Sequence, residues 1–170
     1  MGWSARLRRV ADPLVAALHP VPKVALFPLL LIVFGLGDTP RILASAFAAF
    51  FPILISTLTG VRHIEPVYFE VARNYEVPAW RVLRQVVIPG SLPQALVGLR
   101  LGLNTALLVT ISVELLSARV GFGALIWRAR ETFRLEELYV GLAGSAILGV
   151  SFHAAVGWLT RRLVRWREVE

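Results

Sequence analysis

A polar stretch from Gly60 to Ser91 carries the residue types best suited to recognising another molecule. Glu70 and Arg73 stand three positions apart, so on a helix they lie side by side and can pair with each other or with groups on a partner. Apolar residues recur around them at helical spacing and predict a helix with one apolar face. This pattern favours docking of a partner protein and attachment to lipid headgroups about equally. The predicted face comprises Ile64, Val67, Tyr68, Val71, Ala72 and Tyr75.

Other residues that often carry chemistry predict neither catalysis nor metal binding. The chain has no cysteine, which excludes disulfides and thiolate metal sites. Gly121-Phe122-Gly123 lacks the Lys-Ser/Thr pair of a phosphate-binding loop, and no predicted strand precedes it, so we interpret it as a turn. The histidines at positions 19, 63 and 153 are isolated from one another in the sequence, and we expect each to be structural rather than a ligand.

The composition predicts a membrane protein. Of the 170 residues, 56% are hydrophobic and only 17% are charged, whereas soluble domains usually have about 25% charged residues. A net charge of +7 would fit a nucleic-acid-binding protein, but the arginines fall in short clusters between apolar runs, as in membrane proteins. The alternative is a soluble helical bundle, whose helices should show a polar stripe with a period of 3.6 residues. The run from Leu138 to Leu159 shows none.

Four apolar runs are long enough, or nearly long enough, to cross a bilayer, which takes about 20 residues. The first contains Pro28, which implies a kink. A turn at Gly37-Asp38-Thr39-Pro40 joins it to the second as a hairpin. We therefore expect an all-α, polytopic membrane protein that forms a single domain. The expected spans are 21–37, 42–59, 92–116 and 138–159, with the polar loop at 60–91.

The positive charges predict which ends of the spans face the cytoplasm. Four spans place the N-terminus, the 60–91 loop and the C-terminal tail on one side, and that side carries the larger share of arginine and lysine. We therefore expect all three segments to be cytoplasmic. Within the loop, Trp80 and Leu83 predict a second short helix, and we expect Pro89-Gly90 to end it before the membrane.

Three polar residues interrupt the third expected span, and such residues are functional candidates. We expect Arg100 to extend its side chain to the cytoplasmic surface. Asn104 is a candidate for lining a translocation path or for hydrogen bonding between helices. Glu114 is a second path candidate, but an anion path disfavours a bare carboxylate, so we expect it to pair with an arginine such as Arg119. Small residues within 141–149 predict close helix packing in the fourth span.

The polar stretch resembles the cytoplasmic EAA loop of ABC-transporter permeases. Glu70, Val71 and Ala72 stand at its start, and Ile88 and Pro89 stand near its end. Essentially the whole chain is similar to permeases of the nitrate/sulfonate/taurine/bicarbonate type. Further matching pieces are Phe34-Gly35-Leu36-Gly37, Phe51-Pro52-Ile53-Leu54, Gly98-Leu99-Arg100 and Gly121-Phe122-Gly123-Ala124.

The sequence departs from the family pattern in two respects. Glu76 stands where the EAA loop usually has a glycine, which tolerates a positive φ and so allows a sharp break between two short helices. We expect Pro78 to supply that break here. Family members usually have five or six spans and the chain matches their C-terminal part, so we expect one or two N-terminal spans to be absent.

The resemblance implies a permease subunit of an ABC importer rather than an enzyme. No Walker motif is present, so ATP would be bound and hydrolysed by a separate ATP-binding subunit, and the chain itself would need no cofactor. A dimer of that subunit would dock on the 60–91 loop. The implied contact residues are Glu70, Val71, Ala72, Arg73, Tyr75, Glu76, Ile88 and Pro89.

The remaining implied partners are a second permease copy, an external solute-binding protein and the bacterial inner-membrane lipid, with no nucleic acid. The implied solute is a small anion or organic molecule of the nitrate, sulfonate, taurine or bicarbonate class. The alternative function is a non-transporting membrane scaffold or a degenerate permease fragment.

Overall fold

The computed structural model describes residues 13, 15, 17–18, 20–117 and 120–164. All regular structure within these residues is helical, so the all-α prediction is confirmed. His19, Arg119, the N-terminal basic cluster and the arginines after position 164 lie outside the described residues. The elements are η1 (Lys23–Leu26), α2 (Phe27–Phe34), α3 (Asp38–Arg62), α4 (Pro66–Asn74), α5 (Ala79–Val82), η2 (Leu83–Val87), α6 (Ile88–Ser117), α7 (Phe122–Glu131) and α8 (Leu135–Leu163).

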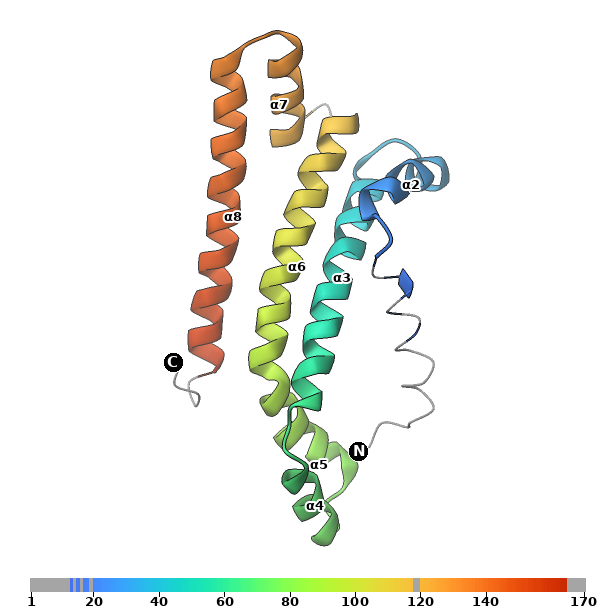
Figure 1. The fold of residues 1–170 in the computed structure, drawn as a ribbon, viewed down its shortest axis with the longest axis vertical. Helices are drawn as coiled ribbons and strands as arrows, with labels where there is room; N and C mark the ends of the chain where they lie inside the picture. The colour runs from blue at the N-terminus through green and yellow to red at the C-terminus, as the bar shows by residue number, and fades with distance from the viewer. Residues whose placement is uncertain (1–12, 14, 16, 19, 118–119, 165–170) are drawn as a thin grey trace.

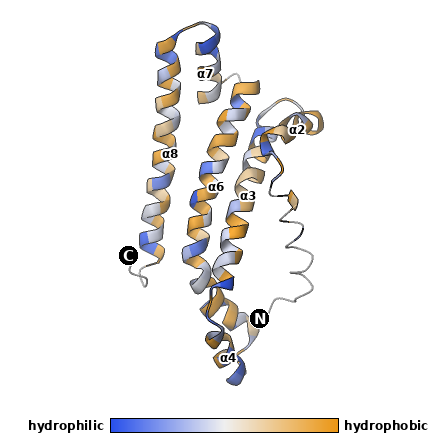
Figure 2. Cartoon of the chain, in the orientation of Figure 1, coloured by the Kyte–Doolittle hydropathy of each residue, from blue (hydrophilic) through white to orange (hydrophobic). Residues whose placement is uncertain are grey.

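Three long helices, α3, α6 and α8, run side by side (Figure 1). Each is long and apolar enough to cross a membrane, and together they contain the second, third and fourth expected spans. Large apolar side chains on their outer faces are exposed, including Leu108 on α6 and Val150 on α8. Hydrophobic residues follow all three helices, whereas hydrophilic residues gather at the tip of α4 and at the turn between α7 and α8 (Figure 2). This distribution suits lipid around the three helices.

The first expected span, 21–37, is shorter in the structure. It forms η1 and the eight-residue helix α2, which is only about 12 Å long against a hydrocarbon core of about 30 Å. Gly35 ends α2 at a φ of 75°, a left-handed conformation that a glycine adopts without strain. Phe27 is buried with Ala44, Ala48, Val109 and Val113, so α2 packs against the α3–α6 pair.

Glycines bring α3 and α6 into close contact. A Cβ on Gly98 would lie 2.6 Å from Ser56 Cβ, and one on Gly102 would lie 2.8 Å from Ile53 Cγ1. Small residues allow such an approach between membrane helices, and dispersion contacts then hold the pair together. Ser45 Oγ and Thr110 Oγ1, 2.7 Å apart, add a hydrogen bond across the interface.

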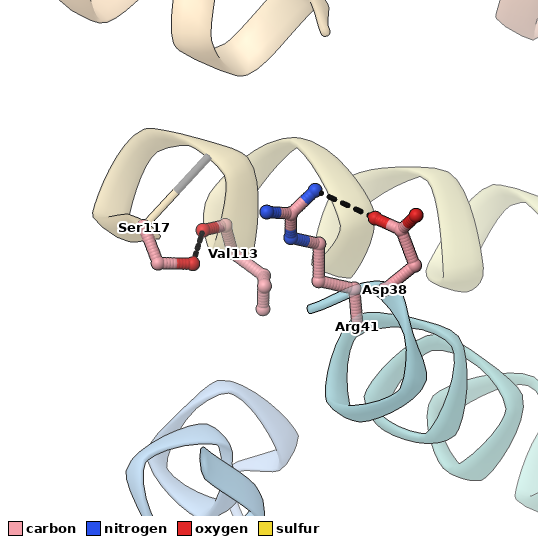
Figure 3. Close-up of polar contacts among 4 residues, drawn as sticks. All are labelled: Asp38, Arg41, Val113 and Ser117. Carbon is pink, nitrogen blue, oxygen red and sulfur yellow. Dashed lines mark hydrogen bonds and ion pairs between the residues drawn. The ribbon is translucent and has the colours of Figure 1, made fainter. Parts of the chain in front are cut away.

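At the end of the bundle away from α4, a polar contact begins α3. Arg41 Nη1 donates to Asp38 at 3.0 Å, and the Asp38 carboxylate lies at the positive end of the α3 dipole (Figure 3). Across from it, at the last turn of α6, Ser117 Oγ donates to the carbonyl of Val113 at 3.2 Å. Similar side-chain to backbone hydrogen bonds occur within the long helices, for example from Thr105 Oγ1 to the Leu101 carbonyl at 2.8 Å.

We expected the second helix of the loop to end at Pro89-Gly90, but it continues past these residues. The chain continues through α5 and the π-helical turn η2 directly into α6, and the whole segment Ala79–Ser117 is helical. A proline inside an α-helix loses one hydrogen bond and clashes with the carbonyl four residues earlier. The wider π-turn that precedes Pro89 loosens that part of the helix. Ser91 Oγ also donates to the Val87 carbonyl at 2.7 Å.

Candidate docking site and polar residues of the spans

Helix α4 presents most of its predicted apolar face to the surroundings. Pro66 occupies its first turn, where a missing N–H costs nothing. Val67, Tyr68 and Val71 are each about half exposed, although a soluble domain would normally bury such a row. Ala72 alone is buried. The apolar row is therefore available for contact with another molecule.

The break after α4 is built on Glu76. This residue has a φ of 50°, the left-handed conformation that the glycine of the EAA pattern would take. The N–H of Val77 donates to the Ala72 carbonyl at 2.8 Å, and the N–H of Glu76 donates to the Arg73 carbonyl at 3.1 Å. Together these form a Schellman cap. The break thus occurs two residues before Pro78, and the expectation that Pro78 supplies it is wrong.

An open groove of about 390 Å³ lies between α4 and the α5–η2 segment. Its lining is mostly apolar, with Arg81 and Gln85 as its polar members. Trp80 lies nearby, about 60% exposed, with the Arg81 guanidinium 5.4 Å from its ring centroid. The full lining is Val67, Tyr68, Val71, Ala72, Val77, Arg81, Val82, Gln85 and Val86.

The structure gathers only part of the predicted contact set at this groove. Val71 and Ala72 line it. Glu70 and Arg73 are exposed on α4, and no ion pair joins them in the part of the chain that the structure describes. Ile88 and Pro89 lie in the first turn of α6 and are not among the lining residues. Val77, in the turn after α4, and Val82 and Val86 were missed, although Val82 and Val86 stand four residues apart, a helical spacing visible in the sequence.

Glu114 binds the N-terminal end of α7. Its Oε2 accepts a hydrogen bond from the N–H of Gly123 at 2.8 Å. A Cβ on Gly121 would overlap the carboxylate, and one on Gly123 would lie 2.5 Å from Glu114 Cβ, so both glycines permit the approach. A carboxylate at a helix N-terminus is stabilised by unpaired N–H groups and by the helix dipole. The segment Gly121-Phe122-Gly123, which we interpreted as a turn, thus comprises the N-cap and first residues of α7, and it binds the carboxylate of Glu114.

Asn104 and Glu114 do not lie together. They are ten residues apart on α6, about 15 Å along the axis, and Asn104 is exposed on the outer surface of the helix. The side chain of Arg100 reaches α8. Its Nη2 is 3.8 Å from the position that a Cβ on Gly157 would take.

The arrangement can now be compared with known proteins. A family model for the inner membrane component of binding-protein-dependent transport systems matches residues 1–168. The chain belongs to this family. Membership confirms the predicted family and the membrane location, and it excludes the soluble bundle. The family is a transport component, in agreement with the prediction that the chain is not an enzyme.

Three relatives illustrate the range of this permease family. The chain is 34% identical over 166 residues to a taurine transport system permease protein of Escherichia coli, covering 98% of the chain and 60% of the relative. It is 37% identical over 160 residues to a riboflavin transport system permease protein of Chloroflexus aurantiacus, covering 94% and 60%. It is 31% identical over 170 residues to a putative ABC transporter permease of Methanocaldococcus jannaschii, covering 99% and 64%. The chain therefore spans less than two thirds of the length of these relatives.

Proposed function

We propose that this permease-family chain forms part of the translocation path of an ABC importer and receives a separate ATPase subunit on its 60–91 loop. The observation that carries the proposal is the open, mostly apolar groove between α4 and η2, with the charged Arg81 and the polar Gln85 among its lining residues. An apolar centre with a charged rim is the usual anatomy of a protein-docking surface.

The groove is mechanically connected to the membrane helices, which supports coupling. The α5–η2 segment continues without a break into α6, and α3 leads directly into the segment before α4. Ile64 packs against the start of α6, since its Cδ1 lies 3.1 Å from the Cβ position of Gly90. Because α3 and α6 are closely packed, a displacement of the groove should move both helices as one body.

The remaining parts of the proposal extend from the family. Two ATP-binding subunits would take part, one at the 60–91 loop of each permease copy, and this loop would face the cytoplasm together with the C-terminal end of α8. A second permease copy and an external solute-binding protein would complete the importer. Relatives are named for taurine, aliphatic sulfonate and riboflavin transport, which supports a small anion or organic molecule as the solute.

The test is docking of the cognate ATPase subunit to the full chain in detergent. We expect Glu70→Ala combined with Arg73→Ala to raise the dissociation constant about tenfold, equal to roughly 1.4 kcal/mol, and to lower coupled ATPase activity. The matched control combines Arg128→Ala with Glu136→Ala, an exposed pair of opposite charges at the other end of the bundle. Unchanged affinity and unchanged coupled ATPase activity in the Glu70/Arg73 variant would contradict the proposal.

A further inference from the structure

Arg100 is a charged residue within the membrane-spanning length of α6. Its Nε is buried and has no hydrogen-bond acceptor among the residues that the structure describes. Within 20–117 and 120–164, no carboxylate forms an ion pair with its guanidinium. Arg100 as a whole is only partly buried, but a charged side chain within a membrane span is costly unless it meets a partner or water. Such a group calls for an acceptor that the described residues do not supply.

Two further polar side chains lie beside Arg100 on the same side of the α6–α8 pair. The two helices are antiparallel, with Leu107 opposite Gly149 and Arg100 opposite Gly157. Asn104 lies between Arg100 and Leu107 on α6, and His153 lies between Gly149 and Gly157 on α8. Asn104 and His153 are therefore at about the same height along the helix pair. At 100° per residue, both project to the side on which Arg100 meets Gly157. Both are exposed.

The surface around these three residues is otherwise apolar. Val97, Leu101 and Leu108 on α6 and Val150 on α8 are exposed beside them. Polar and ionisable groups on a lipid-facing surface are unfavourable, so in membrane proteins they usually face the interior of a bundle or a water-filled path. The polar trio Arg100, Asn104 and His153 therefore marks the side of this helix pair that faces such a path.

We infer that Arg100, Asn104 and His153 form a binding position for the oxyanion group of a transported solute, such as a sulfonate. A guanidinium offers a planar fork of N–H donors that matches two oxygens of an oxyanion, and the Asn amide and an imidazole N–H add neutral donors. The inference rests on the proposed transport function and names the solute group that this path recognises.

A lipid phosphate offers the same chemistry, but the position of the trio favours a solute. Asn104 and His153 lie about one helical turn further than Arg100 from the end of α8 that carries Arg161 and Arg162. A headgroup would sit at that end. The hydrogen-bond donors Asn104 and His153 instead lie deeper in the membrane than Arg100, along the direction in which a solute is transported.

The experiment measures thermal unfolding of the full chain in phosphatidylcholine nanodiscs during titration with methanesulfonate, with chloride at equal ionic strength as reference. We expect a saturable rise in Tm of about 3 to 6 °C at ten times the half-saturating concentration. Arg100→Met should abolish the rise. Arg100→Lys and Asn104→Ala should raise the half-saturating concentration at least about threefold, and they keep the test decisive if Arg100→Met fails to fold. Arg161→Met, an exposed arginine one turn beyond Gly157, should behave as wild type.

Three results would overturn the inference. They are the absence of a methanesulfonate-dependent rise in the wild type, an unchanged half-saturating concentration in both Arg100→Lys and Asn104→Ala, and stabilisation only by nanodiscs that contain phosphatidylglycerol. The last result would assign Arg100 to a lipid headgroup. The measurement needs no ATPase subunit, so failed docking at the 60–91 loop and failed anion binding at the trio are separate outcomes.

Discussion

The two ends of the helix bundle carry the same type of helix cap, but one cap borders an open groove and the other borders closely packed helices. At one end α4 stops at Glu76, and at the other α7 stops at Phe133; both residues have a positive φ, at 50° and 54°. The N–H of Arg134 donates to the Ala129 carbonyl at 2.9 Å, which repeats the Schellman cap after α4. Yet the groove beside α4 is open, whereas α7 is packed against two long helices.

The difference lies in what faces each short helix. Gly141 and Gly144 of α8 leave space that Ile126 and Phe122 of α7 fill, and Glu114 of α6 binds the start of α7. Among the described residues, no long helix lies beside the apolar row of α4, and that row lines an open groove. The same cap can therefore serve a closed structural corner or a docking surface, and the neighbouring glycines decide which.

The largest expected effect comes from filling the space that α7 occupies. A Cβ on Gly144 would overlap the Phe122 ring, so Gly144→Leu should displace α7 and lower the free energy of unfolding by about 3 kcal/mol. Thermal unfolding in detergent measures this. The control is Gly149→Ala, whose new Cβ would meet only the end of the flexible Leu107 side chain at 3.3 Å. If both variants unfold alike, α7 is not held by this packing.

A smaller effect is expected at the carboxylate that begins α7. Glu114→Ala removes the acceptor for the Gly123 N–H and should cost about 1.5 to 2 kcal/mol, since hydrogen bonds to charged groups are worth about that much. Glu114→Gln keeps an acceptor oxygen and should cost less. Chemical unfolding of both variants tests this order. A Gln variant as unstable as the Ala variant would show that the charge, rather than the hydrogen bond, holds α7.

The smallest effect tests the two caps themselves. A non-glycine residue in the left-handed conformation costs about 1 kcal/mol, so Glu76→Gly and Phe133→Gly should each leave stability unchanged or raise it by up to that amount. Glu76→Gly should also keep the affinity for the ATPase subunit, whereas Glu76→Val should lower it because a β-branched residue resists this φ. Equal affinity for the Gly and Val variants would mean that docking does not depend on this turn.

Local sequence patterns predicted much of this fold. The three long helices contain three of the four expected spans, and the α4 helix begins at the proline that favours a first turn. The errors were at junctions. Pro89-Gly90 has the composition of a helix end, but a π-turn carries the helix past it. The left-handed Glu76 was also missed, since a glutamate gives no local signal for a positive φ.

The amino-acid sequence by itself determined which segments are apolar and that one polar loop separates two of them, because hydrophobic periodicity is a local property. Only the tertiary structure decided that Glu114 binds the start of α7, that the apolar row of α4 lines an open groove and that the guanidinium of Arg100 lies beside Gly157 of α8. These outcomes depend on which helices become neighbours and in what register, and those contacts join residues far apart in the chain.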